Sequence, residues 1–281
     1  MDSALDTYYA RMSSSLGDKA RLLDHITGAS VLDVGCGSGD LLNVMLAEGF
    51  DAYGIDPAHE SVLRIRDRSR ARVGYANEIA KVFPGQQFDT IVCSSVFHEV
   101  FSYGTRYDKP GQISSLTHAV KAVNRALKPG GRLIVRDGVA PSDTETRRSM
   151  WVDDPEAVYA FLEASPFAQY NAWHQPGTDR TIRLIATDDP HRFEGSASSL
   201  MEFAFTYVWG QGSFEREVRE FYGIFDLDEY ARFVVETSDL DLRLTSSESY
   251  TQPGYVTHLD GKVKFDFDFP HTNAVWIYDK A

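Results

Sequence analysis

The amino-acid sequence predicts an α/β fold: a Rossmann-like open sheet, mostly parallel, with helices on both faces. Short apolar runs alternate with amphipathic stretches through the first half of the chain, as they do where helical crossovers join parallel strands. A glycine-rich turn follows the first apolar run, at the position where an open parallel sheet usually binds its ligand. This alternation stops at Pro141, which indicates an inserted region.

Five strands are expected in the first half of the chain. The fourth is nearly all apolar after its first residues, as a strand buried on both faces should be. Gly49 is expected to end the first helix of this half in the left-handed conformation, and Pro57 to lie near the first turn of the next helix. The expected strands are residues 29–34, 51–55, 72–76, 88–94 and 132–136, and the expected helices are residues 41–48 and 115–127.

The sequence divides into four regions. Residues 1–28 resemble a helical lead-in or lid that ends at Gly28, and residues 29–140 form the ligand-binding core. Residues 141–224 are irregular, punctuated by prolines and rich in aromatic side chains, which suits either a substrate cap or a purely structural insertion. Residues 225–281 return to the core sheet, with a helix at 227–237 and strands at 242–247 and 274–278.

Composition limits the classes of partner. The formal net charge of −13 argues against nucleic-acid binding, because that binding depends on Lys and Arg side chains neutralising phosphates. The run RIRDRSRAR at residues 64–72 places arginines at alternate positions, which would spread round a helix as a solvated surface. No run of 18 apolar residues is present, the N-terminus is acidic and polar, and two cysteines are too few for a disulfide framework. A cytoplasmic protein without a membrane partner is expected.

The glycine turn VLDVGCGSGD at residues 31–40 is the most informative stretch. Glycine has no Cβ and reaches positive φ freely, so such a turn lets the backbone approach a ligand closely. A dinucleotide fingerprint needs its third glycine at the sixth position, but Asp40 stands there and Gly39 comes one residue early. No Gly-Lys-Ser/Thr follows, and Asp40 would repel a pyrophosphate from the start of the helix. A ligand without phosphates is therefore predicted.

The run Asp33-x-Gly35-x-Gly37-x-Gly39 resembles motif I of the class I S-adenosylmethionine-dependent methyltransferases. Asp56 ends the next strand, where the family places an acid, and the stretches FDTIVCSSVFHEV (88–100) and LKPGGRLIV (127–135) resemble further family elements. The resemblance covers residues 29–137 well and residues 225–281 loosely. It implies an antiparallel last strand, which residues 274–278 would provide.

The resemblance implies S-adenosylmethionine as the cofactor. Asp33 would help to hold its methionine end, and the two carboxylate oxygens of Asp56 would accept from the two ribose hydroxyls. Tyr75 stands where the family more often carries Asp, which leaves Ala76 and Asn77 to contact the adenine. The expected cofactor-binding residues are Asp33, Gly35, Gly37, Gly39, Asp56, Pro57, Ala76, Asn77 and Ser94. Structural alternatives are a simple tight turn for the glycines, loop capping for Asp33 and helix capping for Asp56.

His98 and Glu99 are the candidate catalytic residues. They follow the fourth strand and face the crevice where a substrate would meet the cofactor methyl, so His98 could remove a proton from a nucleophile near neutral pH. Glu99 either orients His98 or points elsewhere, because neighbouring residues rarely share a face. Tyr8, Tyr9 and Arg11 could close over the cofactor. Cys36 and Cys93 are interpreted as packing residues, and no metal site is expected.

The leading functional hypothesis is methyl transfer to a small molecule, most readily by O- or N-methylation. One alternative is methylation of RNA or protein, which would require a basic surface near the crevice, formed by Arg106, Lys109, Arg147 and Arg148. A second alternative is a cofactor-binding partner subunit without catalysis. The sequence does not predict the acceptor or the oligomeric state.

Overall fold

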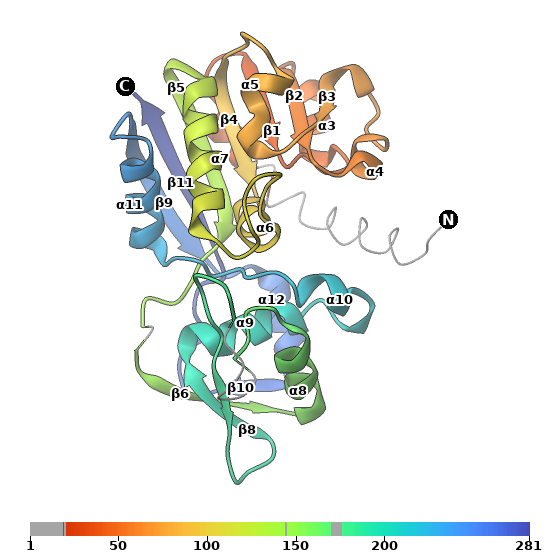
Figure 1. Cartoon of the computed structure of the whole chain (residues 1–281), viewed down its shortest axis with the longest axis vertical. Coiled ribbons are helices and arrows are strands. Elements are labelled where there is room, and N and C mark those ends of the chain that lie inside the picture. Colours follow the sequence, from red (N-terminus) through yellow and green to blue (C-terminus); the bar gives the residue numbers. More distant parts are fainter. Residues whose placement is uncertain (1–18, 20, 144, 170–175) are drawn as a thin grey trace.

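The computed structural model describes Lys19 and residues 21–143, 145–169 and 176–281. Tyr8, Tyr9 and Arg11, which we expected to close over the cofactor, lie outside the described residues. Figure 1 shows a main sheet with flanking helices, and a second, smaller sheet beyond the ends of its strands.

Seven strands form the main sheet of the described chain, in the order β3-β2-β1-β4-β5-β11-β9. Strands β1 to β5 are parallel, whereas β11 runs antiparallel to both β5 and β9. The predicted fold class is confirmed, including the antiparallel strand near the C-terminus. The strands are β1 (Ser30–Val34), β2 (Asp51–Asp56), β3 (Ala71–Val73), β4 (Phe88–Ser94), β5 (Leu127–Gly138), β9 (Leu242–Tyr250) and β11 (Asn273–Lys280).

Helices cover both faces because the strand side chains alternate between two apolar clusters. In β1, Leu32 packs on the face covered by α5, α7 and α11, while Val31 packs with α3 on the opposite face. In β11, Trp276 belongs to the cluster of Leu32, and Val275 belongs to the cluster of Val31. The helices of this half are η1 (Arg21–His25), α3 (Asp40–Ala47), α4 (His59–Val62), η2 (Arg68–Arg70), η3 (Ala76–Glu78), α5 (Ile79–Val82), α6 (Phe97–Tyr103), α7 (Ile113–Ala126) and α11 (Leu227–Thr237).

The inserted region is regular, contrary to its irregular sequence pattern. Its described residues contribute three strands to an antiparallel sheet of order β10-β6-β8-β7. The fourth strand, β10, and the helix before it come from the C-terminal region, which we had expected to serve the core sheet alone. The elements of this half are β6 (Arg147–Val152), α8 (Pro155–Ala164), β7 (Leu184–Ala186), β8 (Arg192–Ser196), α9 (Ala197–Tyr207), η4 (Gln211–Ser213), α10 (Phe214–Glu217), α12 (Pro253–Leu259) and β10 (Val263–Phe265).

Local boundaries follow the expected turn chemistry, with shifts at several elements. Gly49 follows α3 with φ 90°, as predicted, and its N–H donates to the carbonyl of Leu46. Strand β3 ends three residues earlier than expected, because the chain turns into η3 at Ala76. Helix α4 begins two residues after Pro57 rather than at it.

The inserted region docks on α6, the helix that follows β4. The Ser102 hydroxyl accepts a hydrogen bond of 2.8 Å from the backbone N–H of Phe221, and both groups are buried. Phe101 stacks on Phe167 with a centroid separation of 5.8 Å and meets Phe221 edge-on. These contacts hold the inserted region beyond the carboxyl ends of the parallel strands (Figure 1), which is where open α/β sheets bind ligands.

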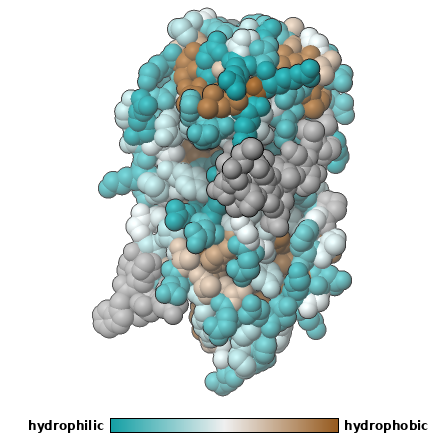
Figure 2. All heavy atoms as spheres, turned by 90° about the vertical axis from the view of Figure 1, so that its right-hand side faces the viewer, coloured by the Kyte–Doolittle hydropathy of each residue, from teal (hydrophilic) through white to brown (hydrophobic). Residues whose placement is uncertain are grey.

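Figure 2 shows that the face turned toward the viewer is mainly hydrophilic, with separate hydrophobic areas in the upper and lower halves. Among the described residues, no helix combines the length and the apolar character that crossing a bilayer requires.

The packing of β11 on α11 gives a test of the fold. Trp276 is fully buried, stacks on Tyr230 at 4.2 Å, and donates through Nε1 to the carbonyl of Leu227. Trp276→Ala should lower the free energy of unfolding by about 3–5 kcal/mol. Tyr107→Ala, at a side chain that is 76% exposed, should change it by no more than about 0.5 kcal/mol. Urea unfolding followed by circular dichroism would measure both, and equal shifts would contradict this packing.

Candidate functional site

The glycine turn lies at the switch point of the sheet, where β1 has β2 on one side and β4 on the other. The backbone N–H of Gly35 donates to the carbonyl of Ile55 at 2.8 Å, which ties the turn to β2. Gly35 has φ 74°, and a Cβ added there would lie 2.4 Å from Cγ2 of Val96. Only glycine fits this position, because any side chain would be strained and would collide with the residue after β4.

The other two glycines serve the same turn. Gly37, at φ 52°, donates its N–H to Asp56 Oδ2 at 2.9 Å. Gly39, at φ 85°, caps the N-terminus of α3, and a Cβ there would lie 2.9 Å from a carbon of Ile65. Gly35, Gly37 and Gly39 therefore all have a left-handed backbone, which is more than a simple strand–helix turn needs.

Asp56 ends β2 and is mostly buried. Its Oδ1 accepts from the N–H of Ala58 at 2.8 Å, and its Oδ2 accepts from Gly37. Burial raises the pKa of Asp56, while these two backbone hydrogen bonds oppose that shift. Ala58, not Asp56, is the N-cap of α4, and Pro57 beside it is exposed. Each oxygen of Asp56 keeps a free lone pair, so the carboxylate can still accept from two further donors.

Two buried polar atoms beside the turn lack partners. Among the described residues, neither Asp33 Oδ2 nor Ser94 Oγ has a hydrogen-bond partner, although Asp33 is only 2% exposed. Burial raises the pKa of Asp33 to about 7, with nearby Lys19 opposing the shift and Asp56 adding to it. Unpaired buried polar atoms cost free energy, so their presence indicates a ligand that satisfies them.

A pocket joins part of the predicted set. Gly35, Gly37, Asp56 and Ser94 all line it, together with Lys19 and Ser95. Asp33, Gly39, Pro57, Ala76 and Asn77 are not among its lining residues. Asn77 donates through Nδ2 to Thr105 at 3.0 Å, and its Oδ1 is buried without a hydrogen-bond partner among the described residues.

His98 lies on α6, held by a carboxylate at the end of β5. Its Nδ1 donates to Asp137 Oδ1 at 2.5 Å, and its Nε2 lies 3.4 Å from Glu220 Oε2 of the inserted region. Burial opposes a charge on this ring, but Asp137 and Glu220 outweigh it and raise the pKa of His98 well above its usual value. Asp137, rather than Glu99, therefore orients the imidazole.

Carboxylates from the inserted region gather around this ring. Tyr103 donates to Glu220 Oε1 at 2.8 Å, and Tyr222 donates to Glu217 and stacks on His98 at a centroid distance of 4.9 Å. Loss of solvation and repulsion by Glu220 raise the pKa of Glu99 to about 8, and the same two causes raise that of Glu217 to about 8.

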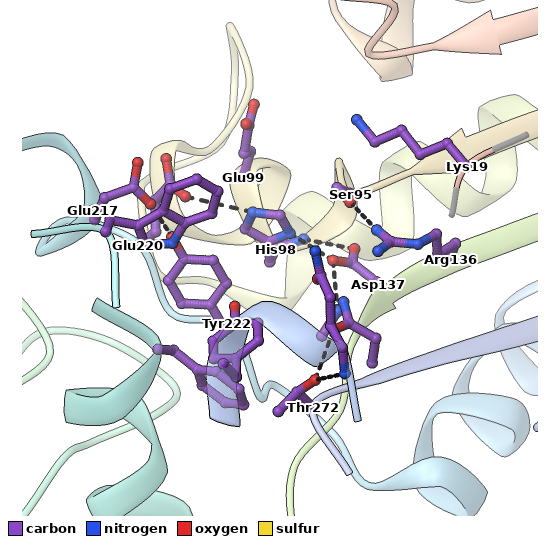
Figure 3. Close-up of a pocket in the computed structure, with 16 residues that line it drawn as sticks. Lys19, Ser95, His98, Glu99, Arg136, Asp137, Glu217, Glu220, Tyr222 and Thr272 are labelled. Carbon is purple, nitrogen blue, oxygen red and sulfur yellow. Dashed lines mark hydrogen bonds and ion pairs between the residues drawn. The ribbon is translucent and has the colours of Figure 1, made fainter. Parts of the chain in front are cut away.

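A second pocket, shown in Figure 3, is lined by His98, Glu217 and Tyr222. It shares Lys19, Ser95, Glu99 and Glu220 with the pocket at the glycine turn. In the figure, Glu217 and Glu220 lie on one side of His98, and Lys19, Ser95 and Arg136 on the other. Ser95 has φ 56°, a strained conformation for serine, and its hydroxyl accepts from Arg136 Nη1 at 2.6 Å. The two pockets are contiguous at this residue.

Sequence reasoning missed several of these residues. Asp137 ends a parallel strand, so the rule that ligands bind at carboxyl ends of strands could have identified it. Glu217, Glu220 and Tyr222 gave no such signal, because the inserted region has no motif and its docking on α6 depends on tertiary packing. Lys19 lies in the lead-in before the first strand, where Tyr8, Tyr9 and Arg11 were named as candidates but Lys19 was not.

Comparison with known proteins agrees with this arrangement. A family model described as a methyltransferase domain matches residues 6–180, more than half of the chain. A ribosomal protein L11 methyltransferase from Vibrio cholerae is 28% identical over 149 residues, which are 53% of this chain and 44% of that protein. A ubiquinone biosynthesis O-methyltransferase from Azorhizobium caulinodans is 30% identical over 128 residues, which are 42% of this chain and 50% of that protein. The chain thus spans half or less of the length of these curated relatives.

A solved structure of an S-adenosylmethionine-dependent methyltransferase from Archaeoglobus fulgidus matches over 97% of this chain and 100% of that one. Its TM-score is 0.50 at 14% sequence identity, which is a likeness of fold. The matched family model, the sheet order and the glycine turn all indicate the same family. The chain belongs to the class I S-adenosylmethionine-dependent methyltransferase family.

Proposed function

We propose that this chain transfers a methyl group from S-adenosylmethionine to a small-molecule acceptor bound beneath the inserted region. The observation that carries the proposal is the pair of contiguous pockets. One contains the glycine turn and Asp56, and the other lies between α6 and the inserted region. Their shared residues Ser95 and Glu99 mark the place where acceptor and methyl group would meet.

The residues at the glycine turn fit the cofactor. Asp56 has lone pairs left for two ribose hydroxyls, and Asp33 Oδ2, which has no hydrogen-bond partner within the described part of the chain, suits the ammonium of the methionine part. The buried Asn77 Oδ1 suits the amino group of adenine, beside the backbone of Ala76. The left-handed glycines leave room for the ligand against their backbone. We assign Gly35, Gly37, Gly39, Pro57 and Ser94 to the walls of this site.

When bound, S-adenosylmethionine supplies a methyl group that its sulfonium already activates for in-line displacement. The protein then has to hold the acceptor atom in line and exclude water, and it needs no covalent intermediate of its own. Tyr103 and Tyr222 brace the carboxylates of the second pocket, which fixes its shape before the acceptor arrives.

His98 and Glu99 divide the acid–base work in this proposal. A general base must be unprotonated, and the two carboxylates beside His98 favour its protonated form near neutral pH. We therefore assign His98 to positioning Glu220 and to balancing charge. Glu99 borders both pockets, and with a pKa of about 8 its ionised form, which grows above neutral pH, is the proposed proton acceptor.

The surface near the pockets supports a small acceptor rather than RNA. A basic surface was the requirement for RNA, yet Arg106 lies 3.6 Å from Glu78, Arg148 lies 2.9 Å from Asp143, and Arg147 pairs with Glu194. Each of these three arginines thus has an acidic neighbour, which weakens its attraction for phosphates.

The Asp56 assignment predicts that Asp56→Ala weakens binding of S-adenosylhomocysteine roughly 100-fold or more, because hydrogen bonds to a charged group contribute about 1.5–3 kcal/mol each. Isothermal titration calorimetry would measure the dissociation constant. Glu60→Ala, at an exposed position on the neighbouring α4, should leave it unchanged. Unaltered affinity in a folded Asp56→Ala variant would remove Asp56 from the cofactor site.

The Asp33 assignment predicts a dependence on pH. Only the ionised carboxylate attracts an ammonium, and the pKa of Asp33 is raised to about 7. Affinity for S-adenosylhomocysteine should therefore rise roughly tenfold from pH 5.5 to pH 7, as the ionised fraction grows. Asp33→Asn should bind more weakly and show a flatter pH profile. Identical profiles in the two proteins would show that Asp33 does not contact the ligand.

A further inference from the structure

We propose that the acceptor is an amine carried on an apolar, preferably aromatic, body. The ammonium form would bind against Glu99, Glu217 and Glu220, and the body would extend along the aromatic wall toward a cavity inside the inserted region. This inference rests on the proposed methyl transfer and names the class of its acceptor.

The charge of the pocket is the first argument. Glu99, Glu217 and Glu220 come together beside His98. A carboxylate oxygen of Glu99, one of Glu220 and a ring nitrogen of His98 lie within 4.8 Å of one another. The raised pKa values of Glu99 and Glu217 follow from burial and from the repulsion that Glu220 exerts on both. A bound cation would relieve this repulsion, whereas an anionic acceptor would add to it.

Two positive groups of the pocket lie on its other side. Lys19 and Arg136 stand on the far side of His98 from Glu217 and Glu220 (Figure 3). Arg136 is buried and donates to Ser95 and to Tyr250, and Lys19 is close enough to Asp33 to oppose the rise in the pKa of that carboxyl. These two cations serve mainly the glycine-turn side. On the carboxylate side, Arg216 of α10 attracts Glu99 and Glu217 but does not prevent the rise of their pKa values, so negative charge remains for a positively charged acceptor.

Aromatic side chains form the remaining wall. Phe205 lies 5.6 Å from the ring of Tyr222 and 5.5 Å from that of Tyr255, and all three line the pocket. Aromatic faces attract cations and pack against apolar groups. A small inorganic cation would use the carboxylates alone, whereas an organic amine would use both surfaces.

A second cavity indicates where the body of the acceptor would extend. It encloses about 330 Å³ within the inserted region, which falls in the size range of small-molecule sites. Phe161, Phe203 and Tyr207 line it, and Trp209 lines both this cavity and the pocket beside His98. An amine seated at the carboxylates could therefore place an aromatic body past Trp209.

The chemistry of an amine also matches the acid–base groups. The ammonium would lose one proton to the carboxylate of Glu99, which frees the nitrogen lone pair. That lone pair would form the new N–C bond as the S–C bond of S-adenosylmethionine breaks, with the bonding electrons staying on sulfur. The positive charge moves from sulfur to the methylated nitrogen, and Glu99 releases its proton to solvent.

Matched acceptor probes test this inference in protein saturated with S-adenosylhomocysteine. Phenethylamine, phenethyl alcohol and phenylacetate share one ring and differ in the polar group, as do tryptamine, tryptophol and indole acetate. Calorimetry should detect binding of both amines at least tenfold tighter than their alcohols, and no binding of the acids. With S-adenosylmethionine instead, mass spectrometry should find the methyl group on nitrogen.

Paired variants assign the effect to the carboxylates. Glu217→Gln should weaken amine binding at least tenfold and leave the alcohol and the cofactor product unaffected. Glu215→Gln is the matched control, because Glu215 lies on the same helix α10 but is exposed. Should Glu217→Gln misfold, Glu99→Gln should likewise weaken binding of the amine relative to the alcohol, with S-adenosylhomocysteine affinity measured in the same variant because Glu99 also borders the cofactor pocket.

Two results would overturn the inference: equal or tighter binding of an alcohol or acid, or absence of amine binding in protein that still binds S-adenosylhomocysteine. If the unaltered protein does not bind S-adenosylhomocysteine, that result would instead contradict the proposed function itself.

Discussion

The architecture of the site depends on one buried carboxylate, Asp137, at the end of β5. It accepts from the backbone N–H groups of Phe97, His98 and Gly138 and from the His98 ring. A buried carboxylate is stable only when donors compensate its charge, and these four donors come from two separate segments. Asp137 thereby fixes the start of α6 against the end of β5. The orientation of His98 follows from that attachment.

The orientation of His98 in turn determines where the inserted region can lie. With Nδ1 committed to Asp137, the other ring nitrogen faces Glu220, and Ser102 and Phe101 on the same helix hold the adjacent residue Phe221. Helix α6 therefore contacts both the end of β5 in the core and the inserted region. The second pocket forms between them, contiguous with the glycine turn. Its carboxylates, whose mutual repulsion Arg216 only partly offsets, are brought together by the same contacts and support an amine acceptor.

The core could be predicted from sequence because its signals are local. Alternating apolar runs and the turn from Gly35 to Gly39 depend on neighbours in the chain, and a positive φ at these positions has few solutions besides glycine. The inserted region could not be predicted in this way. Its sheet pairs β6 both with β8 and with β10, which begins more than a hundred residues after β6 ends, and its short strands carry no distinctive period. The acidic wall was likewise hidden, because Glu217 and Glu220 reach His98 only through tertiary packing. Asp137 was accessible to sequence reasoning through its place at a strand end.

The account rests on the glycine turn binding S-adenosylmethionine. Thermal unfolding of the purified chain with S-adenosylmethionine, S-adenosylhomocysteine, NAD or no ligand tests this most directly. A ligand that binds only the folded state stabilises it by roughly 2.7 kcal/mol at about 100 times its dissociation constant. We expect both sulfur nucleosides to raise the melting temperature and NAD to leave it unchanged. A larger shift with NAD, or no shift with either sulfur nucleoside, would contradict the assignment of the turn.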